Sequence, residues 1–305
     1  MATPTPLQPA PSALTSRAGV YLKREDVHEL GAFKWRGALP VMEAFRRNGT
    51  AEVVTASTGN HGAAAAWAAE QVGVTTTVYA PIGSSRTKLA RIEQLGATVI
   101  EVGADVDEAK DLARAYAESR GLPFFEDGAE PAQLDGYAAI ATELLDQLAT
   151  EPAAVVVPVG NGALLAGVGR VVGARAAGTR RIGVVSADAP VMARSWTAGH
   201  PVECDVCDTI ADGLAVRVAI PTAVEWLLSA ADDMLEVAEP EIAHAVAAFD
   251  AAGIRAEAAA AAALAALPYL EDEGPIVLVV TGGNIDDDLL ARCRSWSAAE
   301  GPKRT

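Results

Sequence analysis

The stretch AAVVVPVGNGALLAGVG (residues 153–169) passes from a run of β-branched residues through glycines into an apolar segment. A short apolar run bounded by glycines predicts a buried strand of a parallel sheet, and the segment after it predicts a helix. Glycines let the backbone approach a ligand closely, and a helix start offers free N–H groups and a positive dipole. The stretch therefore predicts a strand, a loop and a helix, with a loop that suits a phosphate.

The same alternation of short β-rich runs and longer helical stretches continues from about residue 50 onward. The runs predict strands at 52–56, 75–80, 97–102, 153–159, 181–187 and 275–280, with helices between them. This order is typical of an α/β protein in which helices cover both faces of a parallel sheet. The alanine-rich segment 256–267 predicts a buried helix, because small side chains allow close packing.

Two further strands end in small-residue loops that open into helices, TASTGNHGAAAAWAA (residues 55–69) and VVTGGNIDDDLL (residues 279–290). Ligands of open α/β sheets bind at the carboxyl ends of the strands. The three loops together favour a ligand with several anionic or acceptor groups. Each loop alone is explained as well by helix capping or tight packing, and neither the Walker pattern nor the dinucleotide fingerprint is present.

A lysine among aromatic residues favours the ligand-binding interpretation of these loops over capping and packing alone. In GAFKWRGA (residues 31–38), Lys34 stands between Phe33 and Trp35, at a predicted helix start. Desolvation there would lower the pKa of the amine and make it a nucleophile or base, although a surface lysine packing its stem on the aromatics would have the same sequence. A phosphate loop combined with a desolvated amine indicates an aldehyde cofactor that carries a phosphate, pyridoxal 5'-phosphate.

Ordered motifs along nearly the whole chain resemble the threonine/serine dehydratase group of the fold-type II pyridoxal-phosphate enzymes, in the tryptophan synthase beta superfamily. They include GAFKWRGA, STGNHG, RIEQLGATVIEVG, VPVGNGALLAG, TIADGLAV and VVTGGNIDDDLL. The resemblance implies two lobes, each with a mainly parallel sheet flanked by helices, and a cofactor in the cleft between them. It implies a large cofactor-binding domain of residues 1–47 and 131–305 and a small, mobile substrate-binding domain of residues 48–130.

The resemblance also implies a set of site residues. Lys34 would form the Schiff base with the cofactor, and Phe33 would pack against its ring. The other implied cofactor contacts are Asn60 at the ring hydroxyl, Gly160, Asn161, Gly162, Ala163 and Leu164 at the phosphate, and Thr281 at the pyridine nitrogen. Ser57, Thr58, Gly59, Asn60 and His61 would hold the substrate. Glu257 fits either a place near the cofactor ring or that of an ordinary acid at a helix start.

Several positions depart from the family pattern. Asn161 and Ala163 interrupt a glycine run, so the phosphate should be held differently. Thr58 stands where racemases carry a proton-donating serine; its hydroxyl could act catalytically, contact the substrate or cap the helix. Thr281, by contrast, fits the position that the resemblance assigns to the pyridine nitrogen, and its neutral hydroxyl favours elimination over transamination. Ser186 replaces the first acid of a divalent-cation site found in some relatives, so no metal site is expected.

The activity implied is that of an ammonia-lyase acting on a small β-hydroxy amino acid such as threonine or serine, with Lys34 removing the Cα proton. β-Replacement, racemisation and dehydration of a hydroxyaspartate on the same scaffold stay open. A protein that binds the cofactor without turnover is the alternative from another class.

The composition limits the partners. Of the 305 residues, 40 are acidic and 24 are basic, for a formal net charge of -16, which disfavours nucleic acid and anionic membrane surfaces. No apolar stretch is long enough to predict a membrane span or signal peptide, and three cysteines fit a reducing compartment, so a cytoplasmic protein is expected. The C-x-x-C of Cys204 and Cys207 is interpreted as two loop cysteines rather than a zinc or redox site. A homodimer is expected from the resemblance.

Overall fold

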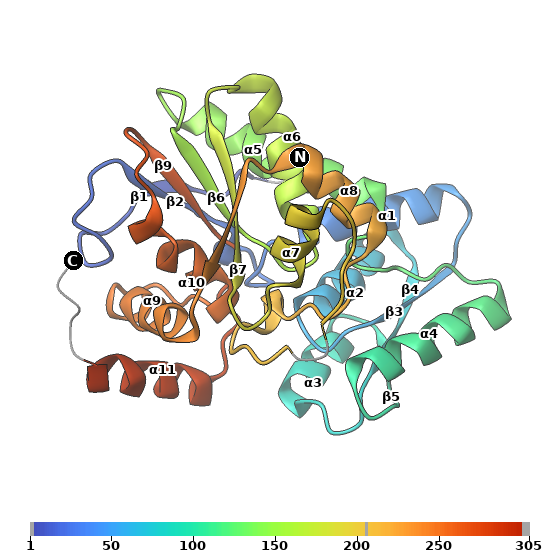
Figure 1. Ribbon diagram of the computed structural model, residues 1–305. Coiled ribbons are helices and arrows are strands. Elements are labelled where there is room, and N and C mark those ends of the chain that lie inside the picture. The colour runs from blue at the N-terminus through green and yellow to red at the C-terminus, as the bar shows by residue number, and fades with distance from the viewer. Residues whose placement is uncertain (1–2, 205–206, 301–305) are drawn as a thin grey trace. The chain divides into compact units, whose positions relative to one another are not determined.

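The computed structural model describes residues 3–204 and 207–300. The chain forms two compact units (Figure 1). Unit 1 comprises Met1–Ala32 and Tyr137–Thr305, and unit 2 comprises Phe33–Gly136. The helix that follows Lys34 belongs to unit 2, where it packs against the next helix along the chain. The functional domain boundaries expected from the sequence, at 47/48 and 130/131, stay a prediction.

Unit 1 contains a six-stranded sheet with the order β1-β2-β9-β6-β7-β8, in which only the β1–β2 pair is antiparallel. The strands are β1 (Leu7–Pro9), β2 (Val20–Arg24), β6 (Ala154–Pro158), β7 (Arg180–Ser186), β8 (Asp233–Val237) and β9 (Ile276–Val280). All five residues of β6 and of β9 are buried, so both faces of these strands are covered. This is the environment that their continuous apolar sequences predict.

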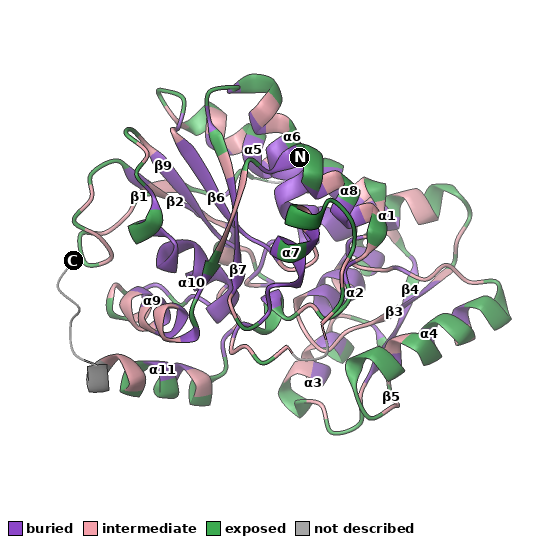
Figure 2. Cartoon of the chain, viewed as in Figure 1, coloured by how far each residue is buried: buried purple, intermediate pink, exposed green. Residues whose placement is uncertain are grey.

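The helices of unit 1 include one that is buried on every side. They are α5 (Pro131–Gln147, which begins in unit 2), α6 (Ala163–Arg175), α7 (Val191–Ala198), α8 (Pro221–Ala230), α9 (Glu239–Ala251), α10 (Ala258–Ala265) and α11 (Asp287–Glu300), with short 3-10 turns at η1 (Glu25–Val27), η2 (Asp212–Leu214) and η3 (Leu267–Tyr269). Every residue of α10 is buried, against β6, β7, β9 and α9 (Figure 2). Its alanines allow this approach, as the sequence predicts.

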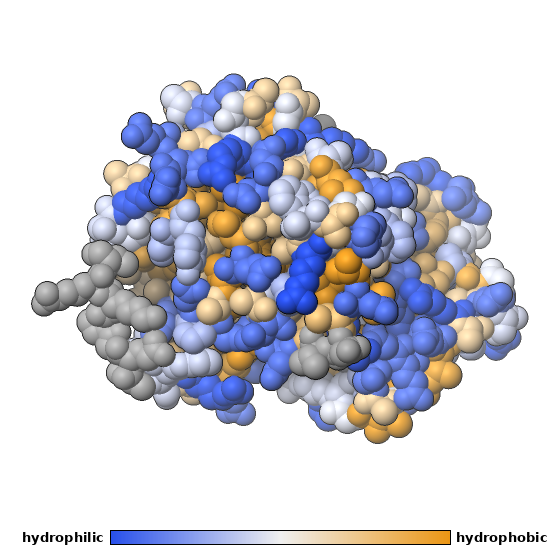
Figure 3. Space-filling view, viewed as in Figure 1, coloured by the Kyte–Doolittle hydropathy of each residue, from blue (hydrophilic) through white to orange (hydrophobic). Residues whose placement is uncertain are grey.

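Unit 2 contains the three-stranded parallel sheet β3-β4-β5, on which α2, α3 and α4 pack, while α1 packs on α2. Its elements are α1 (Trp35–Arg47), β3 (Glu52–Ala56), α2 (Asn60–Val72), β4 (Thr75–Ala80), α3 (Arg86–Gln94), β5 (Thr98–Glu101) and α4 (Val106–Arg120). Helix α4 packs on β3 and β4 through buried alanines, while its outer face is exposed and hydrophilic (Figure 3). Such a half-buried helix is typical of the surface of an α/β unit.

A fully buried lysine ties the amino-terminal segment to the rest of unit 1. Lys23 in β2 has no exposed surface, and its Nζ donates to the Thr5 carbonyl at 2.7 Å and to Glu143 at 2.6 Å. The Thr5 hydroxyl donates in turn to the buried Glu25 at 2.5 Å. Buried charges persist only when they are paired in this way. Within the described residues, no helix is both long and apolar enough to cross a bilayer.

Candidate active site

The predicted nucleophile Lys34 lies at the N-cap of α1. Its Nζ lies 5.0 Å from the centre of the Phe33 ring and 2.5 Å from Oδ2 of Asp127, and its side chain is 18% exposed. Phe33 and Trp35 are both buried. The amine is therefore neither a freely solvated surface group nor fully enclosed. It is fixed at a helix start by a carboxylate and an aromatic face, and it retains some access to solvent.

The carboxylate that binds Lys34 was not among the site residues predicted from the sequence. Asp127 follows a short bridge between Val54 and Phe124, and its Oδ1 accepts from Nε2 of Gln133 at 3.0 Å. Burial alone would raise the pKa of Asp127, but the positive charges of Lys34 and His61 outweigh burial and hold it well below its usual range. In the sequence, Asp127 precedes a glycine and has the appearance of a turn residue, which conceals its role.

His61, in the first turn of α2, is buried and faces the same carboxylate. Its Nδ1 lies 3.7 Å from Oδ1 of Asp127, and its Nε2 lies 2.9 Å from the hydroxyl of Thr55. The ring also packs edge-on against Phe125 at 4.6 Å between centroids. Burial lowers the pKa of His61, and the nearby charge of Lys34 lowers it further, while Asp127 opposes both. The side chain of His61 thus turns toward Asp127 and Thr55. Its assignment to substrate binding stays a prediction.

The loop between β3 and α2 places the other predicted substrate-binding residues at a helix start. Gly59, not Thr58, occupies the N-cap of α2, and its backbone N–H donates to the Ser57 hydroxyl at 3.1 Å. The helix therefore does not use Thr58 as its cap, which leaves substrate contact and proton donation as roles for this hydroxyl. Asn60 is the first residue of α2. The roles of Ser57, Thr58, Gly59 and Asn60 stay predictions.

The predicted phosphate loop follows β6 in unit 1 and leads into α6. Gly162 has φ of 95°, a left-handed conformation that favours glycine. A Cβ at Gly160 would lie 2.4 Å from the carbonyl oxygen of Gly213, so only glycine fits there. The N–H of Ala163 donates to Oδ1 of Asn161 at 3.1 Å. The loop is a glycine-built helix start, with Leu164 in the first turn behind it, and one of its donors is bound by the side chain that interrupts the family's glycine run.

Two more predicted cofactor residues lie at the end of the neighbouring strand β9. Thr281, which follows β9, is buried, and the next residue, Gly282, accepts from the backbone N–H of Glu257 at 3.0 Å. Glu257 is the N-cap of α10 and is also buried, with its carboxylate against Gly282. Because β6 and β9 are adjacent parallel strands, the phosphate loop and Thr281 lie at the same edge of this sheet.

The predicted residues thus form two groups, each assembled within one unit. Unit 2 holds Phe33, Lys34, Ser57, Thr58, Gly59, Asn60 and His61, and unit 1 holds Gly160, Asn161, Gly162, Ala163, Leu164, Glu257 and Thr281. The first group supplies an amine, which is paired with Asp127 of the same unit, and the start of α2. The second supplies a glycine-built helix start and a neutral hydroxyl.

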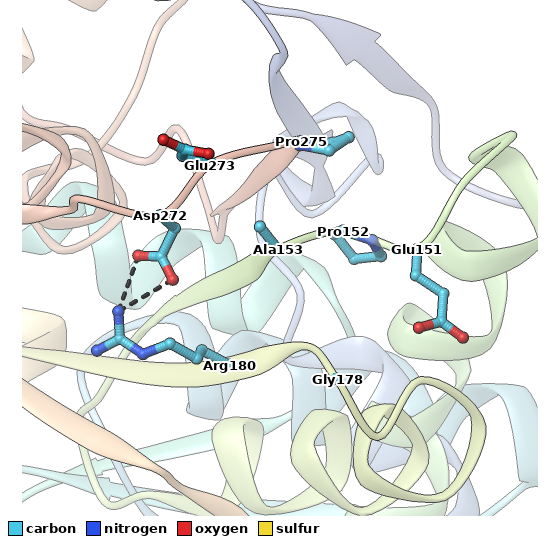
Figure 4. Close-up of a pocket in the computed structure, with 8 residues that line it drawn as sticks. All are labelled: Glu151, Pro152, Ala153, Gly178, Arg180, Asp272, Glu273 and Pro275. Carbon is cyan, nitrogen blue, oxygen red and sulfur yellow. Dashed lines mark hydrogen bonds and ion pairs between the residues drawn. The ribbon is translucent and has the colours of Figure 1, made fainter.

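A pocket of about 370 Å³ lies at the opposite edge of the unit 1 sheet, where β6, β7 and β9 begin (Figure 4). It is lined by Glu151, Pro152, Ala153, Gly178, Arg180, Asp272, Glu273 and Pro275. Its arginine, Arg180, is held by Asp272 at 2.8 Å and by Asp233 at 2.9 Å. The pocket contains none of the predicted site residues and lies at the amino ends of the strands, away from the usual ligand edge of such sheets.

Comparison with known proteins supports the same chemistry. The profile of the family described as "Pyridoxal-phosphate dependent enzyme" matches residues 1–282. The chain is 35% identical over 272 residues to the L-threonine ammonia-lyase of Geobacter sulfurreducens, covering 88% of this chain and 67% of that protein. It is 36% identical over 299 residues to the biosynthetic L-threonine dehydratase of Mycobacterium leprae, covering 93% and 69%.

The fold is likewise similar to that of solved relatives. The processed form of threonine deaminase isoform 2 from Solanum lycopersicum superposes with a TM-score of 0.90 at 30% identity, over 97% of this chain and 88% of that one. The resemblance seen in the sequence motifs is therefore confirmed over the length of both units. The chain belongs to the family of pyridoxal-phosphate-dependent enzymes, in the fold-type II group that includes the threonine ammonia-lyases.

Proposed function

We propose that this protein is a pyridoxal-phosphate-dependent ammonia-lyase that converts L-threonine or L-serine to a 2-oxo acid and ammonia. One observation carries the proposal: the Lys34 amine is fixed at the start of α1, between the Phe33 ring and the buried carboxylate of Asp127. The names of its relatives, which are threonine ammonia-lyases and dehydratases, support the same substrate class.

The residues present fit the cofactor. The left-handed Gly162 and the crowded Gly160 build a helix start at α6, where backbone N–H groups and the helix dipole favour a phosphate. The buried Thr281 hydroxyl offers an uncharged partner to a ring nitrogen. When bound, the cofactor supplies an aldehyde carbon that reacts with amines and a ring that accepts electron density. Lys34 is the residue to which it would attach.

The other side chains then have roles set by their positions. Lys34, once neutral, would remove the Cα proton of the substrate, because a general base must lie within hydrogen-bonding reach of that proton. The start of α2, with Ser57 and Gly59, would hold the substrate carboxylate on backbone N–H groups. Phe33 and Trp35 would exclude water from the amine. Loss of the Cα proton and of the β-hydroxyl together constitutes the α,β-elimination.

A substrate panel tests the proposal. The purified protein, saturated with cofactor, is given L-threonine, L-serine, 3-hydroxyaspartate and O-acetylserine with a thiol, and 2-oxo acid, ammonia, D-amino acid and thioether are measured. Ammonia and 2-oxo acid from threonine or serine support the lyase, and their absence with every substrate contradicts it. A D-amino acid as the main product would instead identify a racemase that uses Thr58, and a thioether would identify a β-replacement enzyme. Lys34→Ala is the matched control.

We also propose a cytoplasmic homodimer that needs no divalent cation. The Ser186 hydroxyl, at the position where some relatives carry a metal-binding acid, donates to Glu239 at 2.5 Å, and the other Glu239 oxygen accepts the backbone N–H of Ile210 at 2.8 Å. Both carboxylate oxygens are therefore used within the protein. We expect a chelator to leave the activity unchanged.

Light scattering on the purified protein measures the oligomeric state and tests the proposed homodimer.

A further inference from the structure

The hydrogen bonds around Thr55 determine which nitrogen of His61 carries a proton. The hydroxyl of Thr55 lies 2.7 Å from the carbonyl oxygen of Phe125, which can only accept, so the single hydroxyl proton lies between them. The same oxygen lies 2.9 Å from Nε2 of His61, so it must accept there. The neutral ring therefore carries its proton on Nε2, and Nδ1 holds a lone pair.

That lone pair faces a carboxylate whose charge is balanced by Lys34. Nδ1 of His61 lies 3.7 Å from Oδ1 of Asp127, and the other oxygen, Oδ2, lies 2.5 Å from Nζ of Lys34. A lone pair beside a carboxylate gains nothing, whereas a protonated Nδ1 would form an ion pair with it. Asp127 thus has two cations available to it, the Lys34 ammonium and the His61 imidazolium, and one of them is enough to balance its charge.

We propose that His61 receives the proton that Lys34 releases when its amine becomes neutral. The Nζ–H bond of the ammonium breaks and a new N–H bond forms at Nδ1 of His61, while Asp127 stays ionised and changes its partner from the Lys34 ammonium to the His61 imidazolium. The three residues carry no net charge before the transfer and none after it. The proposal rests on the proposed function for one point alone, that Lys34 must be neutral to react.

Burial and the surrounding charges determine how readily His61 accepts this proton. Burial and the positive charges of Lys34 and Lys110 lower the pKa of His61, while the Asp127 carboxylate raises it. These are the charged groups in the unit that act on the ring, and Lys110 is held by Glu126 at 2.5 Å. The pKa of His61 is lowered overall while Lys34 is charged. Loss of the Lys34 charge removes one lowering contribution, so that Asp127 and the Phe125 carbonyl, which both raise the pKa, are opposed by burial and Lys110 alone. His61 is then a positioning residue that acts on Lys34 through Asp127.

Titration of the histidines by NMR tests the coupling without any turnover. The full-length chain, freed of cofactor, is labelled on its histidines, and the His61 signal is assigned with the His61→Gln variant. In Lys34→Met we expect the pKa of His61 to rise by about 1 to 3 units relative to the wild type, the usual size of the effect of a nearby charge. Lys110→Met is the comparison: Lys110 also lowers the pKa of His61 but contributes less than Lys34, so the rise should be smaller.

An unchanged His61 titration in a folded Lys34→Met protein would overturn the proposal. The rate at which pyridoxal phosphate attaches to the cofactor-free protein, followed by absorbance across pH, gives a second readout. His61→Gln keeps the Lys34–Asp127 ion pair but removes the proposed proton acceptor, so it should slow this attachment by about tenfold or more. Equal rates in the wild type and His61→Gln would also contradict the proposal. If the lyase assay fails but His61 responds to Lys34, the proposed function is wrong and the coupling stands.

Discussion

The side-chain oxygen of Asn161 accepts the backbone N–H of Ala163, at 3.1 Å, at the start of α6. This donor is one of those that a phosphate would use at a helix start. Asn161→Gly removes the competing acceptor, so we expect it to tighten the binding of pyridoxal phosphate several-fold, since a hydrogen bond to a charged group contributes about 1.5–3 kcal/mol and added backbone freedom offsets part of it. Fluorescence titration measures the affinity. Pyridoxal, which lacks the phosphate, should bind equally to both proteins, and an equal gain for both ligands would contradict this account.

Gly160 has no room for a side chain. Its Cβ would lie 2.4 Å from the Gly213 carbonyl oxygen, so Gly160→Ala must displace the loop, at a cost of about 1–3 kcal/mol of stability for overpacking. We expect weaker cofactor binding as well, because the loop leads directly into α6. Chemical denaturation and cofactor titration check both effects. Gly178→Ala is the control: there the nearest atom to a Cβ is a Glu151 oxygen at 3.9 Å, and both quantities should stay near those of the wild type.

Lys34→Ala should reduce the rate of elimination by about 10²-fold to 10⁴-fold, the usual contribution of a positioned proton-transfer group. It should also abolish covalent attachment of the cofactor. Borohydride reduction followed by peptide mapping shows the attachment site. The wild type should carry the reduced cofactor on the peptide that contains Lys34. A reduced adduct on another lysine would refute this assignment.

The buried Lys23 predicts a large effect on stability. Lys23→Ala leaves Glu143 without this partner, so the free energy of unfolding should fall by about 3–5 kcal/mol, the usual cost of breaking a buried ion pair. Urea denaturation measures it. Arg175→Ala breaks the half-exposed pair with Asp146 and should cost no more than about 1 kcal/mol. Similar losses in the two variants would show that Lys23 is not stabilised by its pairing.

The pKa of His61 in the folded protein lies below that of the unfolded chain, which is near 6.5. Below about that pH the unfolded chain binds a proton that the folded protein does not, so stability is present above this pH and is lost as the pH falls. One such group contributes at most about 1.4 kcal/mol per pH unit. His61→Gln should flatten the fall in stability between about pH 6.5 and 5, as measured by thermal unfolding. An unchanged slope in His61→Gln would contradict this prediction.

The central strands and the buried α10 could be predicted because their sequences carry an unambiguous apolar pattern. β3 and β4 have the bounds expected, and β6 and β9 differ by one residue at their ends. The edge strand β8 and the strand β2 were missed, since β2 contains Lys23 and Arg24 and its stability depends on ion pairs that no local pattern reveals. Tertiary partners decide such strands.

The site was predictable where a motif carries its own chemistry. Lys34 does lie at a helix start beside aromatic rings, and the 160–164 loop does open a helix. Asp127 was not predictable, because it is 93 positions from Lys34 in sequence and only the fold brings the two together. The direction of the His61 side chain could not be predicted for the same reason: it depends on Thr55 in β3 and on Phe125 in the segment between α4 and α5.

The pairing of β2 with β9 joins residue 20 to residue 276, whereas unit 2 is continuous from residue 33 to residue 136. During synthesis on the ribosome, β2 therefore cannot pair with β9 until almost the whole chain has been made. Unit 2, which contains Lys34, can fold as soon as it has emerged. Limited proteolysis of nascent chains stalled near residue 190 should leave a protected fragment that ends near residue 136. The unit that contains Lys34 would thus fold before the predicted phosphate loop of residues 160–164 has emerged from the ribosome.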